Sequence, residues 1–427
     1  MKTTLITTIG LVFCALIYGQ QVDNNFTKHD LIKKHSNEIF DSLVKIRRDL
    51  HMNPEISGQE QRTSKIIEEY LLRLGLEVKT NIGGYGVVGI LKGNKEGRKI
   101  AWRADIDALE TDLPDLVDFK SKNEGIRHIC GHDIHTVIGL GIANVLANQK
   151  NNIAGTIYFI FQPSEENFEG AKSMIDDGLL NFISPDEIYC IHLFPTSIGM
   201  ISTKPQEVFP YIRKIEITFH NGVEIDDIKQ LTKSIAQELF RAKSESKPWE
   251  PQNVFNPDIG IGNPNNIYQD YLIINEDFNI VKQDDDISFE TYLSETNRTN
   301  LDSILKKVKQ KILTTKYRNQ LVSVEYATEN PTVVNDSGLT EKALEIITRI
   351  YGNETVFPIY GQIPFFNDDF AYFQQHVKGV YFFMGGSNFE KGLISVPHSP
   401  DFAVDEDCIK IGVKYFSSLL IERTNMK

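Results

Sequence analysis

The chain has 427 residues, of which 41% are hydrophobic and 24% charged, and this composition excludes a disordered or fibrous protein. Its length exceeds that of one ordinary compact core and predicts at least two domains. The formal net charge of -13, without a cluster of Lys and Arg, argues against nucleic-acid binding, because that function needs a basic surface.

The first twenty residues have the layout of a secretory signal. Lys2 precedes an apolar run at 5–18, and the small and polar residues Gly19 and Gln20 follow. We therefore expect cleavage after residues 1–20 and a secreted or periplasmic protein. The alternative is an N-terminal membrane anchor, although the apolar run is shorter than the roughly 20 residues that a spanning helix needs. No later segment is apolar enough to span a bilayer.

From residue 37 to about 205, helical and strand patterns alternate. Helices are predicted at 38–50, 64–74, 136–148 and 170–175, and strands at 87–91, 100–102, 156–161 and 188–194. Strands that alternate with helices need crossover connections, so we expect an α/β fold with a mostly parallel sheet that is covered on both faces.

The pattern changes in the middle of the chain. A strand at 212–219, a helix at 226–242, strands at 271–275 and 287–293, a helix at 300–313 and a closing strand at 321–326 follow in order. This is the β-α-β-β-α-β order of a ferredoxin-like α+β unit. The α/β pattern then resumes with a helix at 339–351, a strand at 379–384 and a helix at 407–422. We therefore predict a discontinuous larger domain, 21–206 and 318–427, with a smaller domain, 207–317, inserted in it.

The segment HICGHDIH, residues 128–135, combines three histidines, a cysteine and an aspartate just before a predicted helix. Thiolate and imidazole are ligands that borderline divalent metals prefer, and Cys130 and His132 would point the same way in an extended loop. The alternative is a polar helix cap with incidental histidines. Cys190 and Cys408 are the other cysteines after residue 20, and an odd number cannot all pair within one chain.

Three further groups follow apolar strands. Glu165 and Glu166 come after the strand at 156–161, His192 lies near the end of the next strand, and His398 occupies a proline-bracketed loop. Each has an ordinary structural explanation: a solvated carboxylate pair, a core histidine and a surface turn. Open α/β sheets, however, build their sites at the carboxyl ends of strands, so these side chains could meet the first motif there.

The sequence resembles the amidohydrolase branch of the metallopeptidase family that contains aminoacylases, carboxypeptidase G, hippurate hydrolase and the plant auxin-conjugate hydrolases. The matching segments are RRDLHMNPEISGQE at 47–60, WRADIDALE at 102–110, HICGHDIHT at 128–136, FQPSEENFEGAKSMIDDGLL at 161–180, IHLFP at 191–195, FNDDFAYF at 366–373 and HSPDF at 398–402. They run in family order and cover nearly the whole chain outside the insertion.

The resemblance implies a zinc-exopeptidase-like catalytic domain with two divalent metal ions, which could be zinc, manganese, cobalt or nickel. The five implied ligands are Cys130, His132, Glu166, His192 and His398. Glu165 is the implied general base, which deprotonates a water shared by the two ions and passes the proton to the departing amine. Four residues are implied to orient the ligands: Asp105, Asp107, Asp133 and His135. Cys190 and Cys408 are then expected to be small buried hydrophobes.

The inserted domain departs from the family pattern. Relatives carry there a Gly- and His-rich stretch whose histidine stabilises the oxyanion in a neighbouring active site, but this chain has FHNGVEIDD at 219–227. His220 lies too early in the predicted strand to take that role. Asn266 matches a family asparagine and is the expected substrate contact, whereas an expected arginine is replaced near Ser294. The resemblance also implies a homodimer through 207–317.

Three functions are compatible with these observations. The first is metal-dependent hydrolysis of the amide bond of N-acyl amino acids or small peptides. The second is a repurposed metal-binding protein without activity, which the missing histidine stretch favours. The third is a thiol nucleophile at Cys130 with His132 as its base, which is disfavoured because residues two apart in a loop seldom reach each other in that geometry.

Overall fold

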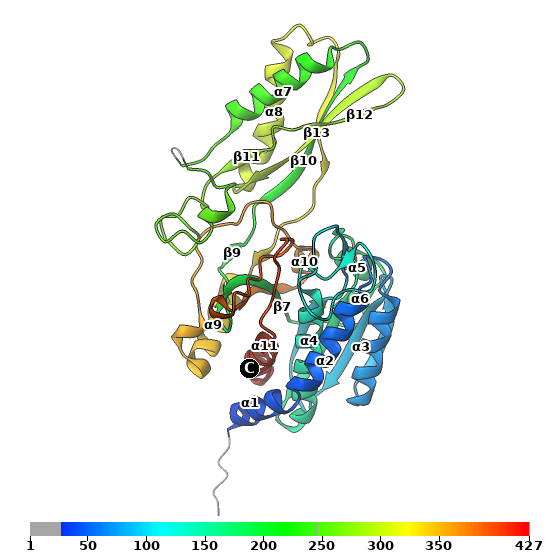
Figure 1. Ribbon diagram of the computed structural model, residues 1–427, viewed down its shortest axis with the longest axis vertical. Coiled ribbons are helices and arrows are strands. Elements are labelled where there is room, and N and C mark those ends of the chain that lie inside the picture. The colour runs from blue at the N-terminus through cyan, green and yellow to red at the C-terminus, as the bar shows by residue number, and fades with distance from the viewer. Residues whose placement is uncertain (1–26, 244–245, 427) are drawn as a thin grey trace, which may run out of the picture.

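The computed structural model describes residues 27–243 and 246–426, and it has two lobes (Figure 1). The larger lobe contains the N-terminal helices and the C-terminal helix, and the smaller lobe is an insertion drawn in green to yellow. The expected signal segment, 1–20, lies outside the described residues. Within the described part of the chain, no helix combines the length and the apolar character needed to cross a bilayer.

A seven-stranded sheet forms the centre of the larger lobe. In spatial order its strands are β1 (Glu77–Ile82), β2 (Gly86–Lys92), β6 (Ala154–Gln162), β3 (Lys95–Asp105), β7 (Glu187–Ser197), β16 (Lys378–Ser387) and β8 (Ile201–Ser202). The four central strands, β6, β3, β7 and β16, are parallel, and the edge strands pair antiparallel. The mostly parallel α/β sheet is thereby confirmed, and the carboxyl ends of its central strands meet at one edge.

Helices cover both faces of this sheet, as expected. One face packs against α1 (Lys28–Glu38), α2 (Phe40–Met52), α3 (Gln61–Arg73), α4 (His132–Asn148), α9 (Ser337–Tyr351) and α11 (Asp407–Asn425). The other face packs against α5 (Gly170–Asp176), α6 (Leu179–Phe182) and α10 (Phe370–Gln374). Short 3₁₀ helices lie at Lys150–Asn152, Pro251–Asn253, Arg298–Asn300, Asn353–Thr355 and Phe389–Lys391.

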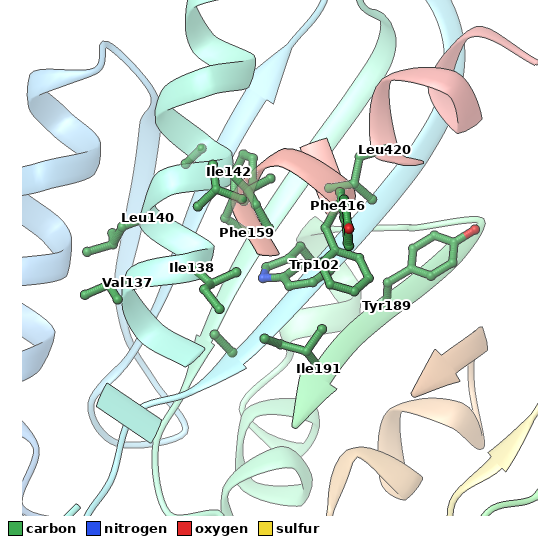
Figure 2. Close-up of a cluster of buried hydrophobic side chains, with 14 of the residues drawn as sticks. Trp102, Val137, Ile138, Leu140, Ile142, Phe159, Tyr189, Ile191, Phe416 and Leu420 are labelled. Atoms are coloured by element: carbon green, nitrogen blue, oxygen red, sulfur yellow. The ribbon is translucent and has the colours of Figure 1, made fainter. Parts of the chain in front are cut away.

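The core between the sheet and its first helical layer is built around Trp102 of β3 (Figure 2). Its ring lies 4.9 Å from that of Phe416 on α11, and side chains of α4 such as Ile138 complete the cluster. Gly141 permits this close packing, because a Cβ there would lie 2.4 Å from Val413 of α11. Helix α4 therefore packs against both the sheet and its neighbour α11, which fixes the position of its first residue.

The sequence pattern predicted where the long helices and strands lie better than it predicted their first and last residues. The helix expected at 38–50 is α2, and a separate helix, α1, precedes it. Helix α4 begins at His132, four residues before the predicted start, because the polar residues of its first turn hide the apolar period. Two-residue strands are too short to show a period, and these are β8, β4 (Leu109–Glu110), β5 (Ile126–Arg127), β9 (Gln206–Glu207) and β15 (Val334–Asn335).

The smaller lobe has the expected ferredoxin-like order. Its elements are β10 (Tyr211–His220), α7 (Ile225–Leu239), β11 (Leu272–Ile274), β12 (Asn279–Lys282), β13 (Asp286–Glu295), α8 (Leu301–Leu313) and β14 (Leu321–Thr328). The antiparallel sheet has the order β11-β13-β10-β14, with the additional strand β12 paired to β13. Because β14 hydrogen-bonds to β10, the smaller sheet extends to Thr328 and not only to residue 317, the boundary expected from the sequence.

Glu422 of α11 joins three helices. It accepts from Lys28 and His29 of α1 at 2.5 and 3.0 Å and from Arg349 of α9 at 3.2 Å. Partial burial alone would raise the pKa of Glu422, but the hydrogen bonds from Lys28 and Arg349 and the charge of Lys28 hold it below its ordinary value. A lowered pKa stabilises the folded state above the pKa of the unfolded chain, and this stabilisation is lost as the pH falls.

Glu422→Gln is therefore expected to lower the free energy of unfolding by about 1 kcal/mol at pH 7. The effect is this small because Lys28 and Arg349 are partly exposed, and water screens their charges. The difference from the wild type should shrink as the pH falls below about 4.3, the value of glutamate in an unfolded chain. Urea unfolding at several pH values measures this, with the exposed Glu341→Gln of α9 as the control. An equal loss in both variants, or a loss that is the same at pH 3 and pH 7, would contradict the expectation.

Candidate metal centre

The five predicted ligands come from separate elements that meet at the carboxyl edge of the sheet. Glu166 follows β6, His192 lies in β7, and His132 is the first residue of α4. The turn between Cys130 and His132 is made by Gly131, whose φ of 91° is in the left-handed region that glycine favours. The two residues thus converge through a turn at a helix start, and not through the extended loop that the sequence interpretation assumed.

The ligand atoms lie close together. Cys130 Sγ is 3.2 Å from His192 Nε2, and Glu166 Oε1 is 3.4 Å from His398 Nε2 and 3.8 Å from His132 Nε2. Two overlapping groups, each with donor atoms within 4.8 Å of one another, contain all five residues: Cys130, His132 and His192, and Cys130, Glu166 and His398. Such an arrangement has enough donors for two neighbouring cations.

His398 reaches this edge although it lies more than two hundred residues from Glu166 in the chain. Its backbone N–H donates to the carbonyl of Ile129 at 2.9 Å, which fastens the loop beside Cys130. The side chain of His398 is 48% exposed, whereas that of His132 is fully buried. The centre is therefore open to solvent on the side of His398 and closed beneath His132.

Backbone carbonyls determine which imidazole nitrogen faces the centre. His132 Nδ1 lies 3.0 Å from the carbonyl of Asp107, and His192 Nδ1 lies 2.9 Å from that of Leu193. A carbonyl can only accept, so both Nδ1 atoms carry hydrogen, and in the neutral rings the lone pair is on Nε2. This is the tautomer that a metal ligand needs.

Three of the four residues expected to orient the ligands contact them or their neighbours. Asp107 lies 3.1 Å from His132 Nδ1 through its carboxylate and accepts the N–H of Glu166 at 3.0 Å. His135 donates from Nδ1 to Asp105 at 2.6 Å and accepts the N–H of Leu193 at its Nε2 at 2.9 Å. His135 thus has no free lone pair for a cation, and it supports the strand that carries His192.

Asp133 does not have the expected role. Its carboxylate lies 2.8 Å from both His51 Nδ1 and Arg47 Nε of α2, and it also accepts the N–H of Ile134. Consecutive residues of a helix point about 100° apart, so Asp133 faces α2 when His132 faces the centre. It fastens the start of α4 to α2 and does not orient a ligand.

The chemistry of the centre fits bound divalent cations. His132 Nε2 and Glu166 Oε1 are buried and have no hydrogen-bond partner. Burial and the charge of Glu166 raise the pKa of the Cys130 thiol, and burial with the charges of Asp368 and Glu166 raises that of Glu165. Converging anions and unpaired donors are costly in a buried position unless a cation compensates them. Thiolate, imidazole and carboxylate donors suit zinc and its neighbours in the first transition row.

A buried network around Arg103 includes Asp105, but its other members, Arg103, Asp368 and Asp369, were not singled out from the sequence. The Arg103 guanidinium donates to Asp105 at 2.6 Å and to Asp369 at 2.9 Å and lies 3.1 Å from Asp368. Asp368 and Asp369 share a cluster with Glu165, so the network forms one wall beside the expected base. The sequence did offer a sign of this network, because Arg103 lies between apolar residues at the end of a predicted strand. A buried arginine is almost always paired with a carboxylate.

The smaller lobe offers fewer polar groups for substrate binding than the family resemblance implied. Asn266 is buried and uses its amide within its own loop, donating to the carbonyl of Asn263 and accepting the N–H of Tyr268, both at 2.7 Å. Both ends of the side chain are thus engaged, which disfavours the expected substrate contact. His220 lies at the end of β10, exposed and hydrogen-bonded to Asp286 at 2.8 Å, so it does not replace the family histidine.

The three cysteines after residue 20 are all buried. Cys190 and Cys408 are buried, unpaired and free of any disulfide, as expected for small hydrophobes. Cys130 and His132 do approach each other, so that argument against a Cys130 nucleophile was wrong. The raised pKa of the Cys130 thiol nevertheless opposes a thiolate nucleophile, which requires a lowered pKa.

Known proteins resemble this chain over most of its length. The family model described as peptidase family M20/M25/M40 matches residues 101–422. Thermostable carboxypeptidase 2 of Saccharolobus solfataricus is 32% identical, and the alignment covers 93% of this chain and all of that protein. The IAA-amino acid hydrolase ILR1-like 4 of Arabidopsis thaliana is 28% identical, with 96% of this chain and 91% of that protein covered.

Solved structures agree on the fold. A dinuclear metal-binding peptidase of the M20 family from Bacillus subtilis superposes with a TM-score of 0.73 at 24% identity, covering 92% of this chain and all of that one. The N-acetylcysteine deacetylase of Bacillus subtilis, which is 28% identical, aligns with 89% of this chain and 96% of its own length. With its converging ligands and these relatives, the chain is a metal-dependent hydrolase that belongs to peptidase family M20/M25/M40.

Proposed function

We propose that this protein hydrolyses the amide bond of N-acyl amino acids or small peptides, with Glu165 as the general base. One observation supports the proposal: beside the five predicted ligands lies a further buried carboxylate, Glu165, with Oε2 3.7 Å from His132 Nε2. A purely structural metal centre has no use for a further buried carboxylate, whereas hydrolysis needs a group that accepts a proton from water. The relatives named carboxypeptidase, amino acid hydrolase and deacetylase support this class of substrate.

Each residue of the centre has a definite part in this reaction. Cys130, His132, Glu166, His192 and His398 would hold two divalent cations, which when bound acidify a water molecule and polarise the scissile carbonyl. Glu165 accepts the proton of the attacking water and then delivers it to the nitrogen of the leaving amine. The wall of Arg103, Asp368 and Asp369 excludes bulk water from one side of Glu165.

A second candidate is a metal-binding protein that has lost the ancestral activity. It is favoured by the smaller lobe, in which β10 ends in the exposed His220 and lacks the family histidine stretch. Loss of one oxyanion donor costs about a hundred- to a thousandfold in kcat. Such a loss would lower the rate of a hydrolase, but it would leave Glu165 and the ligands in place.

The test is amine release from a panel of N-acetyl, N-benzoyl and longer N-acyl amino acids and of dipeptides. The protein is loaded in turn with zinc, manganese, cobalt or nickel, and bound metal is counted before each assay. We expect turnover of at least one substrate class when two equivalents are bound. Two bound equivalents without turnover of any substrate would reject the hydrolase and support the binding protein.

A further inference from the structure

The loop between α2 and α3 carries a motif that the proposed mechanism does not use. Its residues Glu55, Ser57, Gly58 and Glu60 lie in the segment 47–60 that matches the family, yet none of them is a ligand or the base. The loop lies against the turn Pro163–Ser164–Glu165–Glu166 that leaves strand β6. It therefore contacts the chain at the residue next to the proposed base.

Glu60 holds the residue just before the base. Its side chain is fully buried, and Oε1 accepts the N–H of Ser164 at 2.8 Å and that of Gly58 at 2.9 Å. Ser164 has a φ of 55°, in the left-handed region that costs a residue with a side chain roughly 1 kcal/mol or more. A turn of this kind persists only when the surroundings hold it, and the Glu60 carboxylate supplies that hold.

Ser57 supports the residue just after the base. Its Oγ donates to Asp107 Oδ2 at 2.7 Å, and the same oxygen accepts the N–H of Glu166 at 3.0 Å. The backbone N–H groups on both sides of Glu165 are thus bound to carboxylates, one from Glu60 and one from Asp107. With both neighbours fixed, the direction of the Glu165 side chain is fixed as well.

We propose that Glu60 is a positioning residue that sets the direction of the general base by holding the Ser164 N–H. The inference rests on the proposed function, because it concerns the base of that reaction. Glu60 acts through the turn, and it is placed neither on the substrate nor on a cation. A displacement of about 1 Å in a reacting group can cost on the order of a hundredfold in rate, so one hydrogen bond to this turn can matter.

The loop contains its own control. Glu55 is a second carboxylate with two backbone hydrogen bonds, from Arg62 at 2.9 Å and Thr63 at 2.8 Å, but these lie at the start of α3. Glu55→Ala and Glu60→Ala therefore each remove two hydrogen bonds from backbone N–H groups, and Glu60→Ala also removes a contact of 3.5 Å from Ser164 Oγ. Only the second substitution releases the turn that carries Glu165.

We expect Glu60→Ala to lower kcat by about 10- to 100-fold, with KM changed less than about threefold and two equivalents of metal still bound. Glu60→Gln, which keeps an oxygen able to accept the Ser164 N–H, should recover most of the loss. Glu60→Asp, shorter by one methylene, should lose kcat as the alanine does, and it serves if the alanine variant does not fold. Glu55→Ala should keep kcat within about twofold of the wild type.

A measurement that needs no substrate separates this inference from the proposed function. Hydrogen exchange of the peptide covering 163–168 should be faster in Glu60→Ala and Glu60→Asp than in the wild type, and unchanged in Glu55→Ala. If the wild type turns over no substrate, the proposed function fails, and unchanged exchange at 163–168 would still overturn the role of Glu60 on its own. Equal kcat losses in the two alanine variants, or loss of metal in Glu60→Ala, would also overturn it.

Discussion

Glu165→Gln is expected to lower kcat by about 10²- to 10⁴-fold while the protein still binds two equivalents of metal. The amide has the shape of the carboxylate but cannot accept the proton of the attacking water at neutral pH. The five predicted ligands are other residues, and His132 Nε2 lies 3.7 Å from the Glu165 carboxylate. Steady-state kinetics on the best substrate of the panel, together with metal analysis, measures the two effects.

Glu169→Gln is the matched control, because Glu169 belongs to the same loop but is exposed and hydrogen-bonds to Asn167. It should keep the wild-type kcat and metal content. Wild-type turnover in Glu165→Gln would assign the proton transfer to another group. Loss of a metal equivalent in that variant would make Glu165 a ligand and leave the base unassigned.

Removal of the cations with a chelator is expected to reduce turnover to less than about a thousandth, because polarisation of the carbonyl and activation of water supply several kcal/mol. It should also lower the melting temperature. A ligand that binds only the folded state contributes about 2.7 kcal/mol at a hundredfold excess over its Kd. The converging carboxylates would in addition repel one another once the cations are gone.

Kinetics and thermal melts before and after dialysis against chelator, and again after adding zinc or manganese, measure both effects. Cys130→Ala should bind fewer than two equivalents, whereas Cys408→Ala, which removes an equally buried thiol elsewhere, should bind two. Full activity in the metal-free protein would rule out the two-metal mechanism. Equal metal content in the two cysteine variants would remove Cys130 from the ligand set.

The smaller lobe is the part of the protein in which family resemblance and geometry diverge. The engaged amide of Asn266 and the distant His220 leave this lobe without the polar groups that the family pattern implied. Because the family resemblance implied a substrate contact in this lobe, the substrate panel also tests whether the lobe recognises the acyl group. A narrow preference among acyl groups would show that other residues of the lobe have taken over recognition.

The sequence by itself determined the kinds of groups in the centre and the class of fold. HICGHDIH and the Glu165–Glu166 pair are local motifs, and the alternation of helices and strands depends on short-range periodicity. Both the motifs and the periodicity can be recognised in one sequence without knowledge of any tertiary contact. The ferredoxin-like order of the insertion, with its closing strand at 321–326, could be read for the same reason. The expected boundary at 317 nevertheless left this strand, β14, outside the smaller domain, and its pairing with β10 corrects that boundary.

The tertiary structure alone decided how these groups meet. Whether His192 and His398 join Cys130 depends on the order of the strands and on one backbone hydrogen bond at Ile129, which no local period encodes. The turn at Gly131 placed Asp133 toward α2, and the carbonyls of Asp107 and Leu193 set the imidazole tautomers. Contacts between residues far apart in the chain arise from packing of whole elements, so their geometry is invisible in a linear pattern of residue types.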